Sequence, residues 1–473
     1  MNRAHATATL QPPIRAGVFW VFSSVIVGAL MTLVATLPGI LKSGRPLVSE
    51  TNLLFYTLVI YFGAAALYSG YAVLRDDVLF RTASRAVWFG FLLHNGAVAL
   101  RWVSSGRPPV SNIYEMMISF AWGIVLMHLI VERGYRFRFS GLFALPMAAL
   151  AIIMTMILPS DVRPLMPALQ SNLLYIHVSA ALFSYAACAI SFITALLFLV
   201  KDKAKMAGFG VATSVLVSAI YLFLDNLSVV TRGVFHVVGW DSSVNQKIYA
   251  AEKTPLLLEV PGLGSLLLVT LLSSVAMGAL YLLAWNKQES TIEKWADWTL
   301  LISAGLQALS LAVLCFQIEN GSFTNPLYQG WFRTSFSAHP FEVTGLATGL
   351  VLSLLLLAIK TWENPIRGFL PDTAVLDDLT YKMISIGFPL LTLMLITGSI
   401  WANRAWGSYW SWDPKEDWAL ITWLVYATYL HVRITRGWSG RKSAYFSIVG
   451  FAVVMFTFLG VTYLLPGMHA YAN

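Results

Sequence analysis

The chain has 473 residues, of which 58% are hydrophobic and only 11% are charged, and its formal net charge is +8. This composition excludes an ordinary soluble domain, in which charged residues make up about a quarter of the total. The basic residues stand in short clusters between apolar runs and form no basic domain, which excludes nucleic acid as a partner and is typical of the topology signals of a membrane protein.

The apolar runs predict membrane-spanning helices. A bilayer core of ~30 Å needs about 20 apolar residues per helix, and only helices or closed barrels satisfy the backbone in lipid. The first run is longer than the core of a cleaved signal peptide, so we expect a retained span. The sequence therefore predicts an all-α polytopic integral membrane protein in contact with membrane lipid, with about 13 transmembrane helices in one membrane domain. The predicted spans are 16–37, 51–74, 86–104, 114–132, 139–158, 174–200, 208–224, 262–285, 298–316, 342–360, 379–401, 418–434 and 443–465.

Clusters of Lys and Arg predict the orientation of these spans. If the spans alternate, the clusters at 75–85, 133–138, 201–205 and 433–442 all fall on one side. The positive-inside rule makes that side cytoplasmic. The N-terminus is then cytoplasmic and the C-terminus lies outside. The two cysteines, Cys188 and Cys315, stand far apart in apolar runs, so we expect no disulfide framework and no CxxCH heme attachment site in this chain.

The most unusual outer stretch is 401–423, which reads WANRAWGSYWSWDPKEDWALITW and contains six of the chain's 17 tryptophans. Tryptophans at a membrane interface most often form an aromatic belt that faces lipid. Here, however, the rings alternate with charged residues within a predicted loop. This density favours a platform for a flat ligand, and the aromatic belt is the alternative.

Three histidines are candidate ligands for such a molecule. His177 lies at the outer start of its span, and His469 follows the last span. Each position also fits a solvated residue at the end of a loop. His431 lies on the helix that leaves the tryptophan-rich stretch, roughly 20 Å below Trp418, and also fits an interfacial side chain. Two outer histidines beside an aromatic platform favour a planar metal macrocycle, because imidazole suits iron and axial ligands set heme chemistry.

Several segments together resemble the CcsA/ResC-type subunit of the system II cytochrome c synthase, which belongs to the WWD-domain family of heme-handling membrane proteins. WGSYWSWDPKE at 406–416 is similar to the family's tryptophan-rich signature. The segments GRPPVSNIYEM at 106–116, PALQSNLLYIHVSAALFSYAA at 167–187 and GMHAYAN at 467–473 resemble other parts of that family. The resemblance covers about 50–200 and 376–473.

This resemblance implies the roles of individual residues. His177 and His469 would be the two external axial ligands of heme b iron, and His431 would be the in-membrane histidine that receives heme from the cytoplasmic side. The signature would cradle the porphyrin. Its implied contact residues are Trp406, Trp410, Trp412 and Asp413. By charge and side, candidates to neutralise the heme propionates are Arg101, Arg107, Arg404 and Lys415.

The resemblance also implies an activity and partners. Heme and a reduced apocytochrome c would meet on the outer face, where thioethers form between CxxCH thiols and heme vinyl groups. The chain would be a holocytochrome c synthase (heme lyase) subunit that acts with a CcsB/ResB-like membrane protein. That partner would supply a large external domain and the second in-membrane histidine. The expected location is the bacterial plasma (inner) membrane, with the thylakoid membrane as the alternative.

Two features depart from the family pattern. The segment 206–372 has no counterpart in the short members and adds about four spans, so it separates a family N-terminal half at 51–205 from the signature and C-terminal histidine segment at 376–473. His94 stands within a span where we expect an apolar residue. It could supply a second in-membrane ligand, but we favour a core histidine bonded to a neighbour, and we interpret His128 in the same way.

Three other functions remain as alternatives. A heme exporter would deliver heme to a separate chaperone, but the DPKE ending and His469 favour the synthase type. A bis-histidine electron-transfer protein would normally place its paired histidines within spans. A transporter with aromatic belts would bind no heme.

Overall fold

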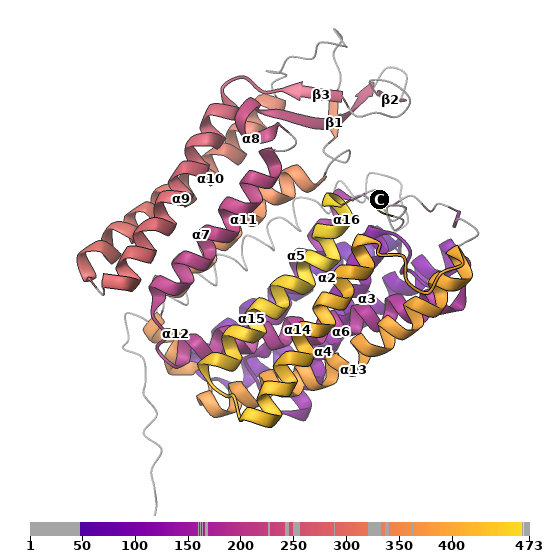
Figure 1. The fold of residues 1–473 in the computed structure, drawn as a ribbon, viewed down its shortest axis with the longest axis horizontal. Coiled ribbons are helices and arrows are strands. Elements are labelled where there is room, and N and C mark those ends of the chain that lie inside the picture. Colours follow the sequence, from indigo (N-terminus) through magenta and orange to yellow (C-terminus); the bar gives the residue numbers. More distant parts are fainter. Residues whose placement is uncertain are drawn as a thin grey trace, which may run out of the picture. The chain divides into compact units, whose positions relative to one another are not determined.

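A computed structural model describes residues 48–158, 160, 162, 164–165, 169–225, 228–241, 246–248, 256–287, 289–319, 333–335, 340–361, 363–465 and 467. Within them the chain divides into two compact units, coloured by sequence in Figure 1. Unit 1 combines the described residues up to 202 with those from 365 onward, and unit 2 comprises 203–364.

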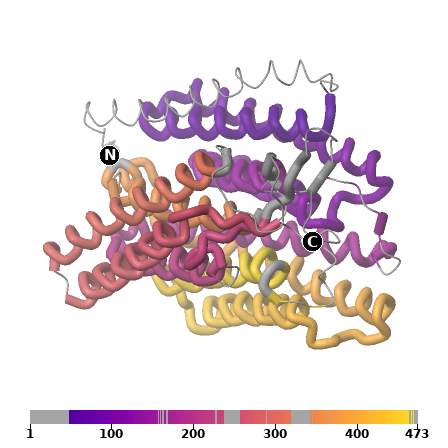
Figure 2. Tube along the Cα trace, turned by 90° about the horizontal axis from the view of Figure 1, so that it is seen from above, coloured from indigo at the N-terminus to yellow at the C-terminus, as the bar shows by residue number. Residues whose placement is uncertain are grey.

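Unit 1 is a helical bundle built around α6, Asn172–Lys201. Helices α4, α13 and α15 pack against α6, which is the most buried of the candidate membrane spans. Figure 2 gives a second view of these helices. The other elements of unit 1 are α2 (Glu50–Leu74), α3 (Asp77–Ser105), α4 (Ile113–Gly134), α5 (Ser140–Ile157), α12 (Glu363–Phe369, from residue 365), α13 (Thr373–Trp406), α14 (Pro414–Arg436), α15 (Arg441–Met455), the π-helical turn η2 (Phe456–Gly460) and α16 (Val461–Leu464).

Hydroxyl pairs fix the packing around α6. The Ser191 and Ser447 hydroxyls are 2.7 Å apart and join α6 to α15, while those of Thr194 and Thr380 are 2.8 Å apart and join α6 to α13. Small and hydroxyl residues allow helices in lipid to approach closely and to hydrogen-bond across the interface. The register of α13 against α6 is therefore set, and this register places the ends that carry the tryptophan-rich loop.

Unit 2 combines long helices with a small antiparallel sheet. Its helices are α7 (Met206–Asp225), α8 (Val229–Arg232), α9 (Leu263–Lys287), α10 (Ser290–Glu319) and α11 (Pro340–Thr361). Helix α7 packs on α9 and α11, and α10 packs on the same two helices. The central strand β1 (Val234–Asp241) pairs with β2 (Gln246–Ile248), β3 (Leu256–Glu259) and β4 (Arg333–Ser335).

The strands lie between the predicted spans 208–224, 262–285, 298–316 and 342–360, in segments for which the sequence predicts no regular structure. In β1, VFHVVGWD is rich in β-branched and aromatic residues, and β3 alternates between buried and exposed positions. Both are strand signals. They were missed because the segments are short and lie between long apolar runs that dominate the hydropathy pattern.

The predicted fold class is confirmed: the described residues form an all-α polytopic membrane protein apart from this sheet. The predicted spans from 51–74 onward each coincide with a helix, and eight described helices are long and apolar enough to cross a membrane. Helices α5 and α11 are shorter apolar helices, and α3 and α14 carry more charge. The predicted span 16–37 lies outside the described residues, and the side on which each terminus lies remains a prediction.

Candidate functional site

A cavity in unit 1 lies where α6, α13 and α14 meet the tryptophan-rich loop. Its empty volume, which includes open solvent at the mouth, is about 1010 Å³. Residues of α6 and α13, most of them apolar, form the larger part of the wall, and Thr457 and Phe458 of the π-helical turn form another part. Its polar side chains include those of Ser111, His177, Lys415 and Glu416. The cavity therefore combines a large apolar surface with a few groups that could orient a ligand.

His177 is held in this cavity by α13. Its Nδ1 lies 2.7 Å from the backbone carbonyl oxygen of Met394. A carbonyl can only accept, so Nδ1 carries the proton and the lone pair of the neutral ring is on Nε2. Metal-binding histidines are commonly oriented by such a bond from the other ring nitrogen. The imidazole is thus in the tautomer that an iron ligand requires.

Gly398 makes this arrangement sterically allowed. A Cβ atom at residue 398 would lie 2.6 Å from both Cε1 and Nδ1 of His177, so any larger residue would displace the ring. The imidazole also stacks on Trp401, with ring centroids 6.5 Å apart and planes 19° apart. Trp401 itself is 1% exposed and packs with Leu169 and Leu174. His177 therefore lies in a socket formed by the Met394 carbonyl, Gly398 and Trp401, which we call the His177 socket.

The predicted tryptophan platform divides into parts with different environments. Trp410 lines the cavity beside Tyr409, which is 60% exposed. Trp406 packs edge-on against Trp401, with centroids 4.8 Å apart, and is not among the residues that line the cavity. Trp412 is 74% exposed at a backbone φ of 58°. The structure thus brings Trp410 together with His177, supports the socket with Trp406, and leaves the Trp412 ring outside.

The acidic residues of the signature start helix α14. Asp413 is the N-cap: its Oδ1 accepts from the Lys415 backbone N–H at 2.9 Å, and Glu416 Oε2 accepts from the Asp413 N–H at 3.3 Å. This reciprocal pattern is a capping box, with Pro414 at the first helical position. Glu416 Oε2 also accepts from the backbone N–H and hydroxyl of Ser411. The sequence S-W-D-P-K-E carried this helix-start signal, which the sequence analysis did not use.

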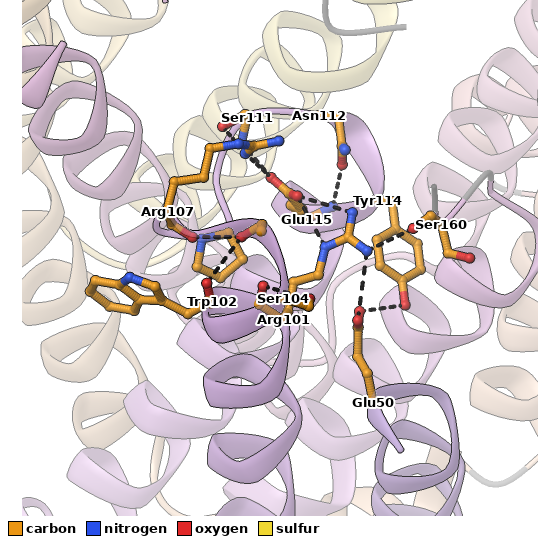
Figure 3. Close-up of polar contacts among 12 residues, drawn as sticks. Glu50, Arg101, Trp102, Ser104, Arg107, Ser111, Asn112, Tyr114, Glu115 and Ser160 are labelled. Atoms are coloured by element: carbon orange, nitrogen blue, oxygen red, sulfur yellow. Dashed lines mark hydrogen bonds and ion pairs between the residues drawn. The ribbon is translucent and has the colours of Figure 1, made fainter. Parts of the chain in front are cut away.

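A buried ionic network holds another segment of the cavity wall (Figure 3). Glu115, which is 0% exposed, accepts from Arg101 Nε at 3.0 Å, Arg107 Nη1 at 2.9 Å and the backbone N–H of Ser111 at 2.9 Å. Arg101 also donates to the Ser160 carbonyl oxygen at 2.6 Å. The network fixes the segment 107–116, which contributes Val110, Ser111 and Met116 to the cavity wall. Glu115 stands in the segment 106–116 that resembles the family, but nothing in the sequence alone marks it as the centre of a network.

This network also changes the assignment of the propionate candidates. Both Arg101 and Arg107 are engaged with the carboxylate of Glu115. Arg404 is exposed and does not line the cavity. Among the described residues, Lys415 is the only Lys or Arg that does. Partial burial lowers the pKa of Lys415 to about 8, and the nearby Asp413 carboxylate opposes this shift.

The remaining predicted histidines lie elsewhere or outside the described residues. His431 is exposed on α14, on the same helix face as Ile421, Leu424 and Thr428, and does not line the cavity. His94 is 0% exposed, and its Nδ1 lies 3.3 Å from the hydroxyl of Tyr61.

His128 is likewise buried, with its Nδ1 2.8 Å from Ser140 Oγ. His469 lies outside the described residues. Gly467, two positions before it, lies against Asp413, because a Cβ at residue 467 would collide with that carboxylate.

Comparison with known proteins gives consistent matches. A family model described as cytochrome C assembly protein matches residues 110–252 and 260–469. A cytochrome c biogenesis protein CcsA from Nostoc punctiforme is 34% identical over 423 residues, which cover 89% of this chain and 94% of that protein. The proteins of the same name from Microcystis aeruginosa and a Picosynechococcus species are 33% and 34% identical over 422 residues, covering 88% of this chain and 94% of each relative. These alignments leave fewer residues unmatched than 206–372 contains, so these relatives share much of that segment.

Proposed function

The chain belongs to the cytochrome c assembly protein family, and we propose that its part in cytochrome c maturation is to hold heme b in the cavity beside His177 and present it to apocytochrome c. It is a multi-pass membrane protein, and we place it in the plasma (inner) membrane or a thylakoid membrane. Heme is the substrate in this scheme. Each cysteine thiol of the CxxCH motif adds across a heme vinyl group, so that sulfur bonds to one vinyl carbon and hydrogen to the other.

The His177 socket is the observation that carries this proposal. The Met394 carbonyl fixes the proton on Nδ1 and directs the ring, Gly398 leaves room for it, and Trp401 stacks on it. A histidine with only a structural role would not need a glycine beneath it and an apolar cavity in front of it. These features fit an imidazole that binds the iron of a flat, largely apolar macrocycle.

His469 would bind the iron from the other side. Gly467 lies against Asp413, and Asp413 begins the helix whose next residues line the cavity. The chain therefore passes the tryptophan-rich loop two residues before His469. Two nitrogen ligands would leave no open coordination position, which protects the iron from oxygen chemistry until the cytochrome takes it.

His431 would receive heme earlier in the pathway. It is exposed on a face of α14 that also carries Ile421 and Leu424. A heme bound there would be open to a second membrane protein, and the CcsB/ResB-like partner would supply the opposite histidine. Ionisable groups on a membrane face are costly, which favours a functional role for this one. Thioether formation by a holocytochrome c synthase would then require both proteins.

The proposal is tested by the visible absorption spectrum of the detergent-purified chain. We expect bound low-spin heme in the wild type and a weakened or shifted spectrum in His177→Ala and His469→Ala. His431→Ala should reduce the amount of heme loaded and leave the spectrum of the remaining heme unchanged. His236→Gln, in unit 2, is the matched control. Unchanged heme in all three test variants would reject the ligand assignments.

Two alternative functions predict different results. A heme exporter that delivers heme to a separate chaperone would bind heme but form no thioether-linked cytochrome when the partner and apocytochrome c are added. A bis-histidine electron-transfer protein would keep its heme throughout catalysis and pass electrons. In our proposal the heme leaves the chain covalently attached to the cytochrome, which a denaturing gel stained for heme detects.

A further inference from the structure

Lys415 is the one cation presented to the cavity by the described residues that line it. The two other candidates to bind a propionate, Arg101 and Arg107, are bound to Glu115 and do not line the cavity. Neither a hydrogen bond nor an ion pair within 4 Å joins the Lys415 ammonium group to any described residue. The Asp413 carboxylate favours the protonated amine only through space, so a ligand carboxylate would give this partly buried ammonium group a direct ionic partner.

The neighbouring carboxylates of Asp413 and Glu416 form no ion pair with this ammonium group within 4 Å, and both accept hydrogen bonds at the start of α14. Asp413 accepts from the Lys415 backbone N–H, and Glu416 accepts from Ser411 and from the Asp413 N–H. These bonds, together with the positive end of the α14 dipole, reduce the negative potential at this corner. The cavity therefore offers an apolar surface, an imidazole and one cation that has no direct ion pair among the described residues.

Given the proposed function, on which this inference rests, we propose that Lys415 binds a propionate of the heme held by His177. A heme carries both of its propionates along one edge and its vinyl groups away from that edge. The contact would place the propionate edge at the start of α14 and thereby fix which way the vinyl groups face. Lys415 is then a positioning residue: it determines the orientation of the heme, and His177 binds the iron.

The test compares heme with an ester that lacks the two carboxylate charges. Heme and heme dimethyl ester are titrated into the full-length chain in detergent, for the wild type, Lys415→Met, Lys415→Arg and Arg404→Met. We expect the wild type to bind heme roughly 10-fold more tightly than the ester, as for one hydrogen bond between charged groups. Lys415→Met should bind both with the affinity that the wild type has for the ester, while Lys415→Arg and Arg404→Met should keep the preference.

The outcomes separate this inference from the proposed function. If the wild type binds both compounds equally, or if Lys415→Met keeps the full preference, the role of Lys415 is rejected while the His177-dependent spectrum stands. If the wild type binds neither compound, the proposed function fails and this inference fails with it. The His177-dependent spectrum of ester bound to Lys415→Met is the check that this variant is folded.

Discussion

At the scale of single residues, the imidazole of His177 depends on the absence of a side chain at position 398. We predict that Gly398→Ala displaces the ring, because the new methyl group would lie 2.6 Å from Cε1 and Nδ1. Such a distance is far inside van der Waals contact, so the bond to the Met394 carbonyl must break or lengthen. The expected result is at least a ~10-fold loss of heme affinity, the equivalent of one hydrogen bond to a charged or metal-bound group, measured by titration of the absorption spectrum.

Gly63→Ala in α2 is the matched control, since nothing lies within 4 Å of a Cβ at that position. Both substitutions should favour the helix slightly, because alanine has the higher helix propensity. A loss of heme in Gly398→Ala alone is therefore an effect on the socket. Equal heme affinity in both variants would contradict the socket.

The charge on Lys415 predicts how heme binding depends on pH. Its pKa in the free protein is lowered to about 8 by burial, and a bound propionate would stabilise the protonated form and raise that pKa. The preference for heme over its dimethyl ester should then be constant below pH 8 and fall as the pH rises through 8, because binding must first protonate the amine. In Lys415→Arg the preference should persist to higher pH. A wild-type preference that is flat from pH 7 to 9 would contradict the prediction.

At the scale of elements, the buried Glu115 joins the ends of α3 and α4. We predict that Glu115→Gln destabilises unit 1 by about 3–5 kcal/mol, because Arg101 and Arg107 both lose a buried ion pair and Arg101 keeps the longer pair with Glu50 at 3.6 Å. Both Arg101 and Arg107 bond to this carboxylate. Thermal unfolding in detergent measures the effect.

The matched control is Asp378→Asn, which breaks the ion pair with Lys382 on α13. Those two side chains are 52% and 41% exposed, and surface pairs contribute only about 0–1 kcal/mol. A similar loss of stability in the two variants would mean that the network does not hold the wall. A large loss of stability in Glu115→Gln alone would support the role of the network in holding the wall.

The helices could be predicted from the sequence because a long apolar run in lipid must satisfy its own backbone hydrogen bonds, which a helix does. The capping role of Asp413 and Glu416 was missed, since polar residues beside tryptophans were interpreted as ligand contacts. The network of Glu115 could not be predicted, because it joins side chains from separate helices and from the segment near Ser160. Of the His177 socket, only the histidine could be predicted from the sequence. Its histidine stands out in a span, but its glycine and carbonyl belong to α13, more than 200 residues away.

At the scale of the whole molecule, the described residues that line the cavity belong to unit 1. Unit 1 is formed by two parts of the chain, one before unit 2 in the sequence and one after it. The predicted division at 206–372 is close to the bounds of unit 2, 203–364. The CcsA proteins that match 88% or more of this chain share much of that segment. Unit 2 is thus a regular part of such long members, and we propose that heme binding does not require its helices directly.

This separation predicts that the two units can be destabilised independently. In unit 2, a Cβ at Gly210 would collide with the ring of Tyr281 on α9, so Gly210→Ala should cost about 1–3 kcal/mol through overpacking. In unit 1, a Cβ at Gly123 would lie 3.0 Å from Ala186 on α6. Cys188 is buried in α6, so the temperature at which a thiol reagent labels it reports on the unfolding of unit 1.

We expect Gly210→Ala to lower the first transition of a thermal scan while the Cys188 labelling temperature and the heme spectrum stay unchanged. Gly123→Ala should lower the Cys188 labelling temperature and weaken heme binding together, because α6 forms part of the cavity wall and α4 contributes Met116 to it. Gly305→Ala on α10, where nothing lies within 4 Å of the added Cβ, should change neither. If Gly210→Ala exposes Cys188 as early as Gly123→Ala does, the units unfold as one, and unit 2 is then an integral support of the heme cavity.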